Sequence, residues 1–301
     1  MLGPLLAILS ALGSSAKAIF IKLAYRGADV DAVTLLALRM IFAAPFFLGV
    51  AWWTSRGQAP FTRRDWTLMA ALGFVGFYLA SFLDFWGLEH ISVGLERLIL
   101  YTYPAMVVVL SAVWLHKPVG WREWTALGVA FTGVGVVFWN DVAPTSQAHS
   151  VVLGSAAVFG AALAYALYVI GIGQMVGRIH SLRLTGAVIS LSTFFVLGQF
   201  FLMRDARALR QPPAIYGYAA AMAILSTVLP IFLTSEAIRL IGASRVSIMG
   251  FLGPVATIYM GDYFLGEHMT ALQWLGTALV IAGVALTSMR KSAGATGAPP
   301  R

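Results

Sequence analysis

Residues 103–134 read YPAMVVVLSAVWLHKPVGWREWTALGVAFTGV, and residues 253–284 read GPVATIYMGDYFLGEHMTALQWLGTALVIAGV. Each stretch places a proline inside an apolar run, then a short charged turn, a tryptophan and a glycine-rich apolar run. At a shift of 150 residues the prolines and tryptophans coincide: Pro104 with Pro254, and Trp124 with Trp274. Apolar runs match one another easily by chance, so these coincidences carry the comparison, and they indicate an internal duplication.

The composition of the whole chain is that of a membrane protein. Of 301 residues, 59% are hydrophobic and 11% are charged, whereas soluble domains carry about 25% charged residues. Because a helix needs about 20 apolar residues to cross a bilayer, the apolar runs predict ten transmembrane helices: 3–24, 32–54, 66–88, 92–115, 121–139, 152–175, 182–203, 214–238, 244–265 and 271–289. The short links leave no room for a separate soluble domain.

Five helices make up each predicted copy, and five is an odd number. A second copy that follows the first therefore enters the membrane from the opposite side. We expect an all-α integral membrane protein of two inverted five-helix repeats, 1–145 and 146–291, with a disordered tail over 292–301. Inverted repeats are a recurring transporter architecture, in which the substrate binds near the midplane between the halves and access alternates.

Charge and cysteine content narrow the function classes. The net charge is +8, but the basic residues are scattered at helix ends, where lipid head groups and topology explain them, so no nucleic-acid partner is expected. Twelve Lys and Arg residues fall on the side of both termini and six on the other, which predicts cytoplasmic termini. The chain has no cysteine, which excludes disulfides and thiolate chemistry. We expect no cofactor, no metal and no obligate protein partner.

The two repeats, the helix-borne Pro104 and Pro254, the turn Leu265-Gly266-Glu267 and the Gly-Val helix ends resemble the EamA-type branch of the drug/metabolite transporter superfamily. Within that branch the chain is most similar to bacterial exporters of aromatic amino acids. The resemblance implies a central cavity lined by helices 1 to 4 and 6 to 9, with helices 5 and 10 at the periphery. The first half departs from the family pattern, because it has Leu115-His116-Lys117 at the corresponding turn.

Ionisable residues inside a span are expensive, so each is a candidate for function. Lys17 and Arg39 lie well inside their spans, where they either form structural ion pairs and hydrogen bonds or recognise a substrate carboxylate. The remaining candidates lie nearer helix ends, where interfacial pairing is the simpler explanation: Asp84, Glu96, Arg97, Glu236 and Asp262. No carboxylate stands out as a buried proton carrier, which leaves proton antiport, exchange and facilitated diffusion open.

Aromatic residues concentrate on the third and fourth predicted helices. The candidates for substrate contact are Tyr78, Phe82, Trp86 and Tyr101, with Tyr165 from the second half. A packing or lipid-facing role is the alternative for each of them. A tyrosine hydroxyl in the middle of a span needs a polar partner, which favours Tyr78 and Tyr101 over the phenylalanines.

Pro104 and Pro254 each remove a backbone hydrogen bond and expose a carbonyl one turn earlier, near Leu100 and Gly250. Such a site is either a static kink or a gating hinge, and Gly250 and Gly253 add freedom to the second one. The start of the same helix carries two further candidates for contact with a polar substrate: Ser244 and Ser247.

The sequence predicts a transporter in the cytoplasmic membrane that exports small amphipathic metabolites, such as aromatic or other neutral amino acids, by alternating access. Lys17 in the first helix disfavours cationic drugs. The alternative is an exporter of drug-like aromatic compounds or of another metabolite. An intramembrane enzyme is remote, because the five histidines lie in or beside loops and no HExxH or GxSxG motif occurs.

Overall fold

The computed structural model describes the chain apart from residues 1, 117–119, 143–146, 177, 269 and 295–301. Within the described part, regular structure is helical and forms ten spans, numbered 1 to 10 in chain order: α1 (Leu2–Gly27); α2 (Ala32–Ser55); α3, η1 and α4 (Arg63–Leu72, Gly73–Leu79, Ala80–Leu88); α5 and α6 (Val93–Leu100, Tyr103–Leu115); α7 (Trp121–Val142); α8 (Ala148–Met175); α9 (Ser181–Met203); α10, η3 and α11 (Pro213–Ala223, Ile224–Val228, Leu229–Ile241); α12 and α13 (Ala243–Gly250, Leu252–Leu265); and α14 (Ala271–Gly294). A short 3₁₀ turn, η2 (Ala206–Leu209), lies between spans 7 and 8.

These spans confirm an all-α, multi-pass membrane protein. Nine described segments are long and apolar enough to cross a bilayer, and the tenth, over Ala271–Leu286, is apolar but shorter. Helix α14 runs on to Gly294, past the start of the predicted tail, and residues 295–301 lie outside the described part.

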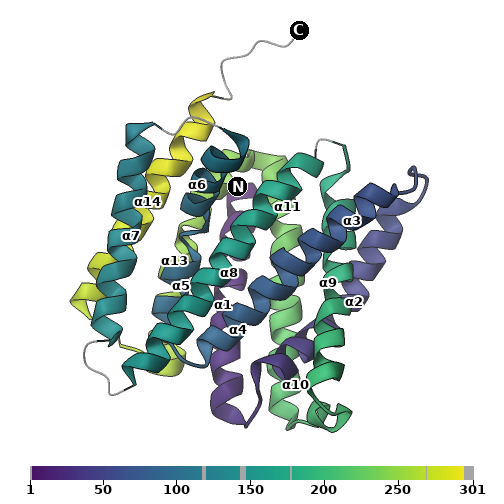
Figure 1. The fold of residues 1–301 in the computed structure, drawn as a ribbon, viewed down its shortest axis with the longest axis horizontal. Coiled ribbons are helices and arrows are strands. Elements are labelled where there is room, and N and C mark those ends of the chain that lie inside the picture. The colour runs from purple at the N-terminus through teal and green to yellow at the C-terminus, as the bar shows by residue number, and fades with distance from the viewer. Residues whose placement is uncertain (1, 117–119, 143–146, 177, 269, 295–301) are drawn as a thin grey trace.

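The contacts between spans follow the repeat: a pair of spans in contact corresponds to a second pair in which each span is replaced by its counterpart in the other half. Spans 1 and 8 pack together through α1 and α11, and spans 3 and 6 do so through α4 and α8. Helix α1 lies in the middle of the bundle, whereas α7 and α14 pack on each other at one edge (Figure 1). Spans 5 and 10 are therefore peripheral, and the two five-helix halves face each other across the centre.

Glycines fix the contact at that edge. A Cβ on Gly133 of α7 would lie 2.6 Å from the carbonyl oxygen of Gly276, and a Cβ on Gly283 of α14 would lie 2.6 Å from that of Ala126. Helices in lipid associate through such close backbone approaches, because small residues leave room for them. The Gly-Val endings that mark both repeats in the sequence are thus the points where the backbones of spans 5 and 10 meet.

The helices are interrupted at matching places in the two halves. Span 3 contains the π-helical segment η1 and span 8 contains η3, and residues 74–78 map onto 224–228 at the shift of 150. Span 4 breaks at Tyr101 and span 9 breaks at Phe251, which also correspond. The predicted spans 66–88 and 214–238 are continuous apolar runs, so the sequence gives no sign of the π segments.

The turns after spans 4 and 9 match as well. His116 and Gly266 occupy the same position of the repeat, and both take the left-handed conformation that ends a helix, with φ of 50° and 66°. The first half therefore keeps the turn geometry although it lacks the glycine that this geometry favours.

Candidate functional site

A group of charged side chains lies where the end of span 3 and the start of span 4 meet span 1. The Nζ atom of Lys17 lies 2.6 Å from Oδ2 of Asp84 and donates a hydrogen bond to it. Asp84 on α4 is 2% exposed, and Glu96 in the first turn of α5 is 0% exposed. The side chain of Lys17 is 19% exposed, although Lys17 lies on the central helix α1. We call Lys17, Asp84 and Glu96 the charged triad.

Arg97 extends this group towards the second half. Its Nε donates to Oγ1 of Thr257 at 2.9 Å, and its Nη2 donates to the backbone oxygen of Ser14 at 3.0 Å. The carbonyl of Gly253 accepts from Thr257 at 3.1 Å and from the hydroxyl of Ser15 at 2.9 Å. Spans 1, 4 and 9 are therefore joined by polar contacts beside the predicted hinge glycine.

Arg39, the other cation placed well inside a span, is engaged elsewhere. It is 6% exposed, and its Nε and Nη2 donate to Oγ1 of Thr227 at 3.3 and 3.0 Å. Thr227 belongs to η3 and itself donates to the carbonyl of Met222. The guanidinium also lies 5.6 Å from the ring centre of Phe85. Arg39 thus ties span 2 to the π segment of span 8, which the sequence does not indicate.

The acidic residues near helix ends fall into two classes. Glu236 pairs with Arg239, and Asp262 pairs with His268, on exposed surface. Asp84 and Glu96 are buried instead, so interfacial pairing is the wrong interpretation for them. The packing of spans 1, 3 and 4, rather than distance from a helix end, decides which of these carboxylates are buried.

Tyr101 and Gly250 meet at the two helix breaks. The hydroxyl of Tyr101 donates to the carbonyl oxygen of Gly250 at 2.7 Å. The rings of Tyr101 and Phe251 lie 6.2 Å apart between their centres. The carbonyl that the sequence predicts to be released before Pro254 therefore has a partner, and that partner is one of the tyrosines proposed for substrate contact. Pro104 stands at the start of α6, where it begins a new helix after the break.

The other predicted aromatic residues lie in two places. Tyr78, Phe82 and Trp86 are half-buried and pack against the largest apolar cluster of the bundle. The ring of Tyr78 lies 5.0 Å from that of Phe74, and that of Trp86 lies 4.9 Å from the His90 ring.

Tyr165 belongs to a row of rings that crosses between the halves. Its ring centre lies 4.9 Å from that of Tyr103 on span 4 and 5.7 Å from that of Tyr168 on its own helix. Tyr168 in turn lies 5.1 Å from Phe77 on η1. The side chains of Ser244 and Ser247 lie outside the described part of the structure.

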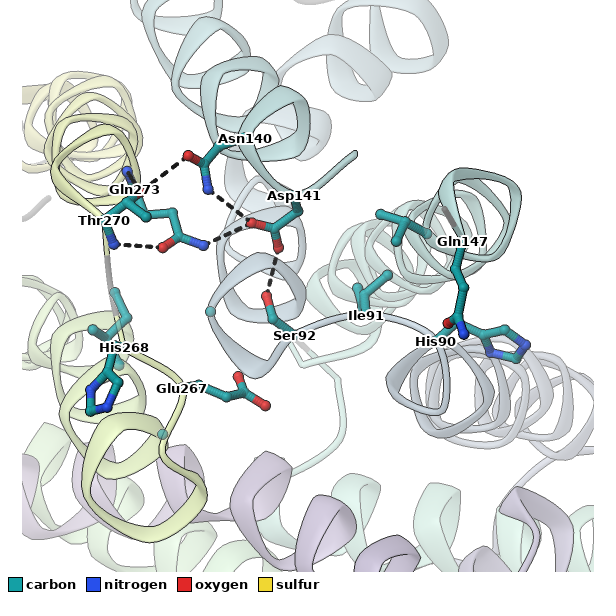
Figure 2. Close-up of a pocket in the computed structure, with 14 residues that line it drawn as sticks. His90, Ile91, Ser92, Asn140, Asp141, Gln147, Glu267, His268, Thr270 and Gln273 are labelled. Atoms are coloured by element: carbon teal, nitrogen blue, oxygen red, sulfur yellow. Dashed lines mark hydrogen bonds between the residues drawn. The ribbon is translucent and has the colours of Figure 1, made fainter. Parts of the chain in front are cut away.

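A pocket of about 460 Å³ opens at the end of the bundle opposite Leu2, which we call the distal end. Asp141, in the last turn of α7, accepts from Ser92 Oγ at 2.8 Å and from Gln273 Nε2 at 2.7 Å (Figure 2). Gly94 and Ile258 also line the pocket. Gly94 lies on the same helix as Arg97, and Ile258 directly follows Thr257.

Glu267, which follows span 9, lines this pocket and contacts the first half. Its Oε2 accepts from the backbone N–H of Val93 at 2.9 Å, and its Oε1 lies 3.8 Å from Arg26. Sequence reasoning missed this role because both partners lie far away along the chain, Val93 by 174 residues. Nearby, burial raises the pKa of Glu89 above its usual value, and a hydrogen bond from the Ala32 N–H opposes that rise.

Comparison with known proteins agrees with this architecture. The model of the EamA-like transporter family matches the chain twice, at residues 1–139 and 152–289. The chain belongs to the EamA-like transporter family. Both matches to this EamA protein end within spans 5 and 10, so each covers five spans.

Curated relatives of this EamA protein are named as transporters. It is 30% identical over 270 residues to the uncharacterized transporter YcbK of Bacillus subtilis, with 87% of this chain and 85% of the relative covered. It is 25% identical over 275 residues to a probable terminal-alkyne amino-acid exporter of Streptantibioticus cattleyicolor, with 88% and 86% covered. One crystal structure superposes with a TM-score of 0.61 at 15% identity over 97% of this chain and 98% of the other, which shows a shared fold.

Proposed function

We propose that this EamA protein exports small amphipathic metabolites, aromatic or other neutral amino acids, across the cytoplasmic membrane by alternating access. The observation that carries the proposal is the charged group itself. Lys17 and Arg97 supply positive charge, and Asp84 and Glu96 supply negative charge, within one buried region between spans 1, 3 and 4. A zwitterion has a carboxylate and an ammonium, so it matches such a region better than an ion of one sign does.

Aromatic side chains along the spans suit the rest of such a substrate. The row Phe77, Tyr168, Tyr165 and Tyr103 joins spans 3, 6 and 4. Rings in this arrangement provide apolar contact and, through tyrosine hydroxyls, polar partners. The relative named as a probable terminal-alkyne amino-acid exporter supports the same substrate class.

The switch between the two access states depends on the helix breaks and on the contacts at the distal end. The breaks at Tyr101 and Phe251 let the two parts of spans 4 and 9 turn against each other, as loop-like hinges do. Opening of the distal end separates Glu267 from Val93 and Arg26. The excess of basic residues on the side of the termini supports a cytoplasmic position for that side, opposite the distal pocket.

Flux in proteoliposomes tests this proposal. Labelled phenylalanine, tryptophan and alanine are compared with a cationic dye, using purified protein in vesicles. Saturable amino-acid flux that the dye does not inhibit supports the proposal. Flux of the dye alone contradicts it and favours export of drug-like aromatic compounds, the alternative function.

A further inference from the structure

The carboxyl groups of Asp84 and Glu96 are buried neighbours, and most of their oxygens lack a hydrogen-bond partner within the described residues. Lys17 occupies Oδ2 of Asp84, and Oδ1 has no hydrogen-bond partner within the described residues. Both carboxyl oxygens of Glu96 likewise have no partner there. The two side chains lie within hydrogen-bonding reach of each other. Two ionised carboxylates cannot form that bond, because neither carries a proton to donate.

Burial makes the ionised form of this pair costly. A buried charge without a hydrogen bond loses its hydration and gains nothing in return. Two like charges side by side add repulsion, and such carboxyl pairs hold one proton between them. One proton on Glu96 removes both costs, since Glu96 then donates to Oδ1 of Asp84 while Lys17 keeps Oδ2.

No cation of the described residues forms a salt bridge with Glu96, although Arg97 and Lys17 act on it electrostatically. Arg97 uses Nε and Nη2 on Thr257 and on the Ser14 carbonyl, both neutral acceptors. Arg39 and Lys22 also interact electrostatically with this pair, Arg39 with Asp84 and Lys22 with Glu96. Arg39 is bound to Thr227, and Glu267 also attracts Lys22. Among the residues that the structure describes, Lys17 alone forms a salt bridge with a carboxylate of the pair.

We infer that Asp84 and Glu96 form a proton-binding site in which Glu96 carries the proton. The position of Lys17 depends on whether that proton is bound. Loss of the proton leaves a second buried carboxylate, which draws Lys17 from Asp84 into a position between the two. Lys17 lies on α1, which packs against α10, α11, α12 and α13, so its movement acts on the contact between the halves. The partial exposure of Lys17 gives water a way to the pair.

Coupling of this proton site to substrate export rests on the proposed function. A site that binds a proton in one access state and releases it in the other drives export against a substrate gradient. Proton binding itself needs no substrate, so it is measured separately from transport.

Infrared difference spectroscopy of the full-length protein in lipid nanodiscs tests the site. Wild type shows a carboxylic-acid C=O band that shifts in D₂O and disappears as the pH is raised. Glu96→Gln removes the band, and the control Glu236→Gln, on exposed surface, keeps it. Glu96→Gln folds, because its amide donates to the free Oδ1 of Asp84; Asp84→Asn is a second variant, which shifts the midpoint of the band.

Three results overturn the site: no such band in wild type, an undiminished band in Glu96→Gln with an unmoved midpoint in Asp84→Asn, or removal of the band by sodium at constant pH. In proteoliposomes the response of phenylalanine flux to a pH gradient is lost in Glu96→Gln and kept in Glu236→Gln. An equal response in both variants overturns the coupling. Absence of phenylalanine flux beside a normal infrared band contradicts the proposed substrate and leaves the proton site supported.

Discussion

The two halves of this protein share their backbone and differ in their chemistry. The π segments, the helix breaks and the left-handed turns recur at a shift of 150 residues. The charged residues do not recur: Asp84, Glu96 and Arg97 correspond to Thr234, Val246 and Ser247. Thr234 shares a 2.6 Å hydrogen bond with Ser10, where Asp84 holds Lys17. The two halves thus share a symmetric backbone frame, and the first half alone carries the charged triad.

Removal of the triad's cation has the largest expected effect. Lys17→Met leaves Asp84 buried without its ion pair, which costs about 3 to 5 kcal/mol of stability. Thr234 occupies the position that corresponds to Asp84. Thr234→Val removes its neutral hydrogen bond with Ser10, at a cost of about 1 kcal/mol. Thermal unfolding in detergent measures both. Equal effects of the two variants contradict the chemical asymmetry.

Alanine at the edge glycines tests the symmetry of the frame. Gly133→Ala and Gly283→Ala each press a methyl group onto backbone atoms of the facing helix, and we expect about 1 to 3 kcal/mol of destabilisation from either. Gly135→Ala, on the same helix as Gly133, has open space and is the control. A large loss for one glycine and none for the other contradicts an equivalent role for spans 5 and 10.

Tyr101→Phe makes the break in span 4 resemble the break in span 9, which already carries Phe251. The variant deprives the Gly250 carbonyl of its donor, and we expect a loss of about 1 kcal/mol. The matched control is Tyr103→Phe, whose ring packs against Tyr165. Thermal unfolding measures the loss, and hydrogen exchange at residues 248–253 locates it. Unchanged exchange there argues against the hinge contact.

The smallest expected effect is a gain. His116→Gly relieves a non-glycine residue at a φ of 50° and stabilises the protein by up to about 1 kcal/mol. Gly266→His places histidine at the corresponding position and destabilises the protein by a similar amount. Unfolding midpoints of the two variants that move in the same direction contradict the equivalence of the turns.

Hydropathy was enough to predict the all-helical multi-pass fold, and the repeated proline and tryptophan indicated the duplication that the two matches of the family model also show. The partners of the charged residues were not predictable, because hydropathy does not say which face of a helix meets which neighbour. A π segment inserts an extra residue into a turn and rotates all that follows. In span 3 that segment precedes Asp84, so a regular helical wheel drawn from Tyr78 misplaces the acid. Lys17 and Arg39 were recognisable as candidates, since a cation inside a span always needs a partner.

The most direct measurement is labelled phenylalanine flux in proteoliposomes that contain wild type, Lys17→Met or Thr234→Val, with equal amounts of folded protein. We predict saturable flux for wild type, at least a tenfold loss for Lys17→Met, and near wild-type flux for Thr234→Val. Equal flux for all three proteins would contradict the claim that the charged triad of the first half carries transport.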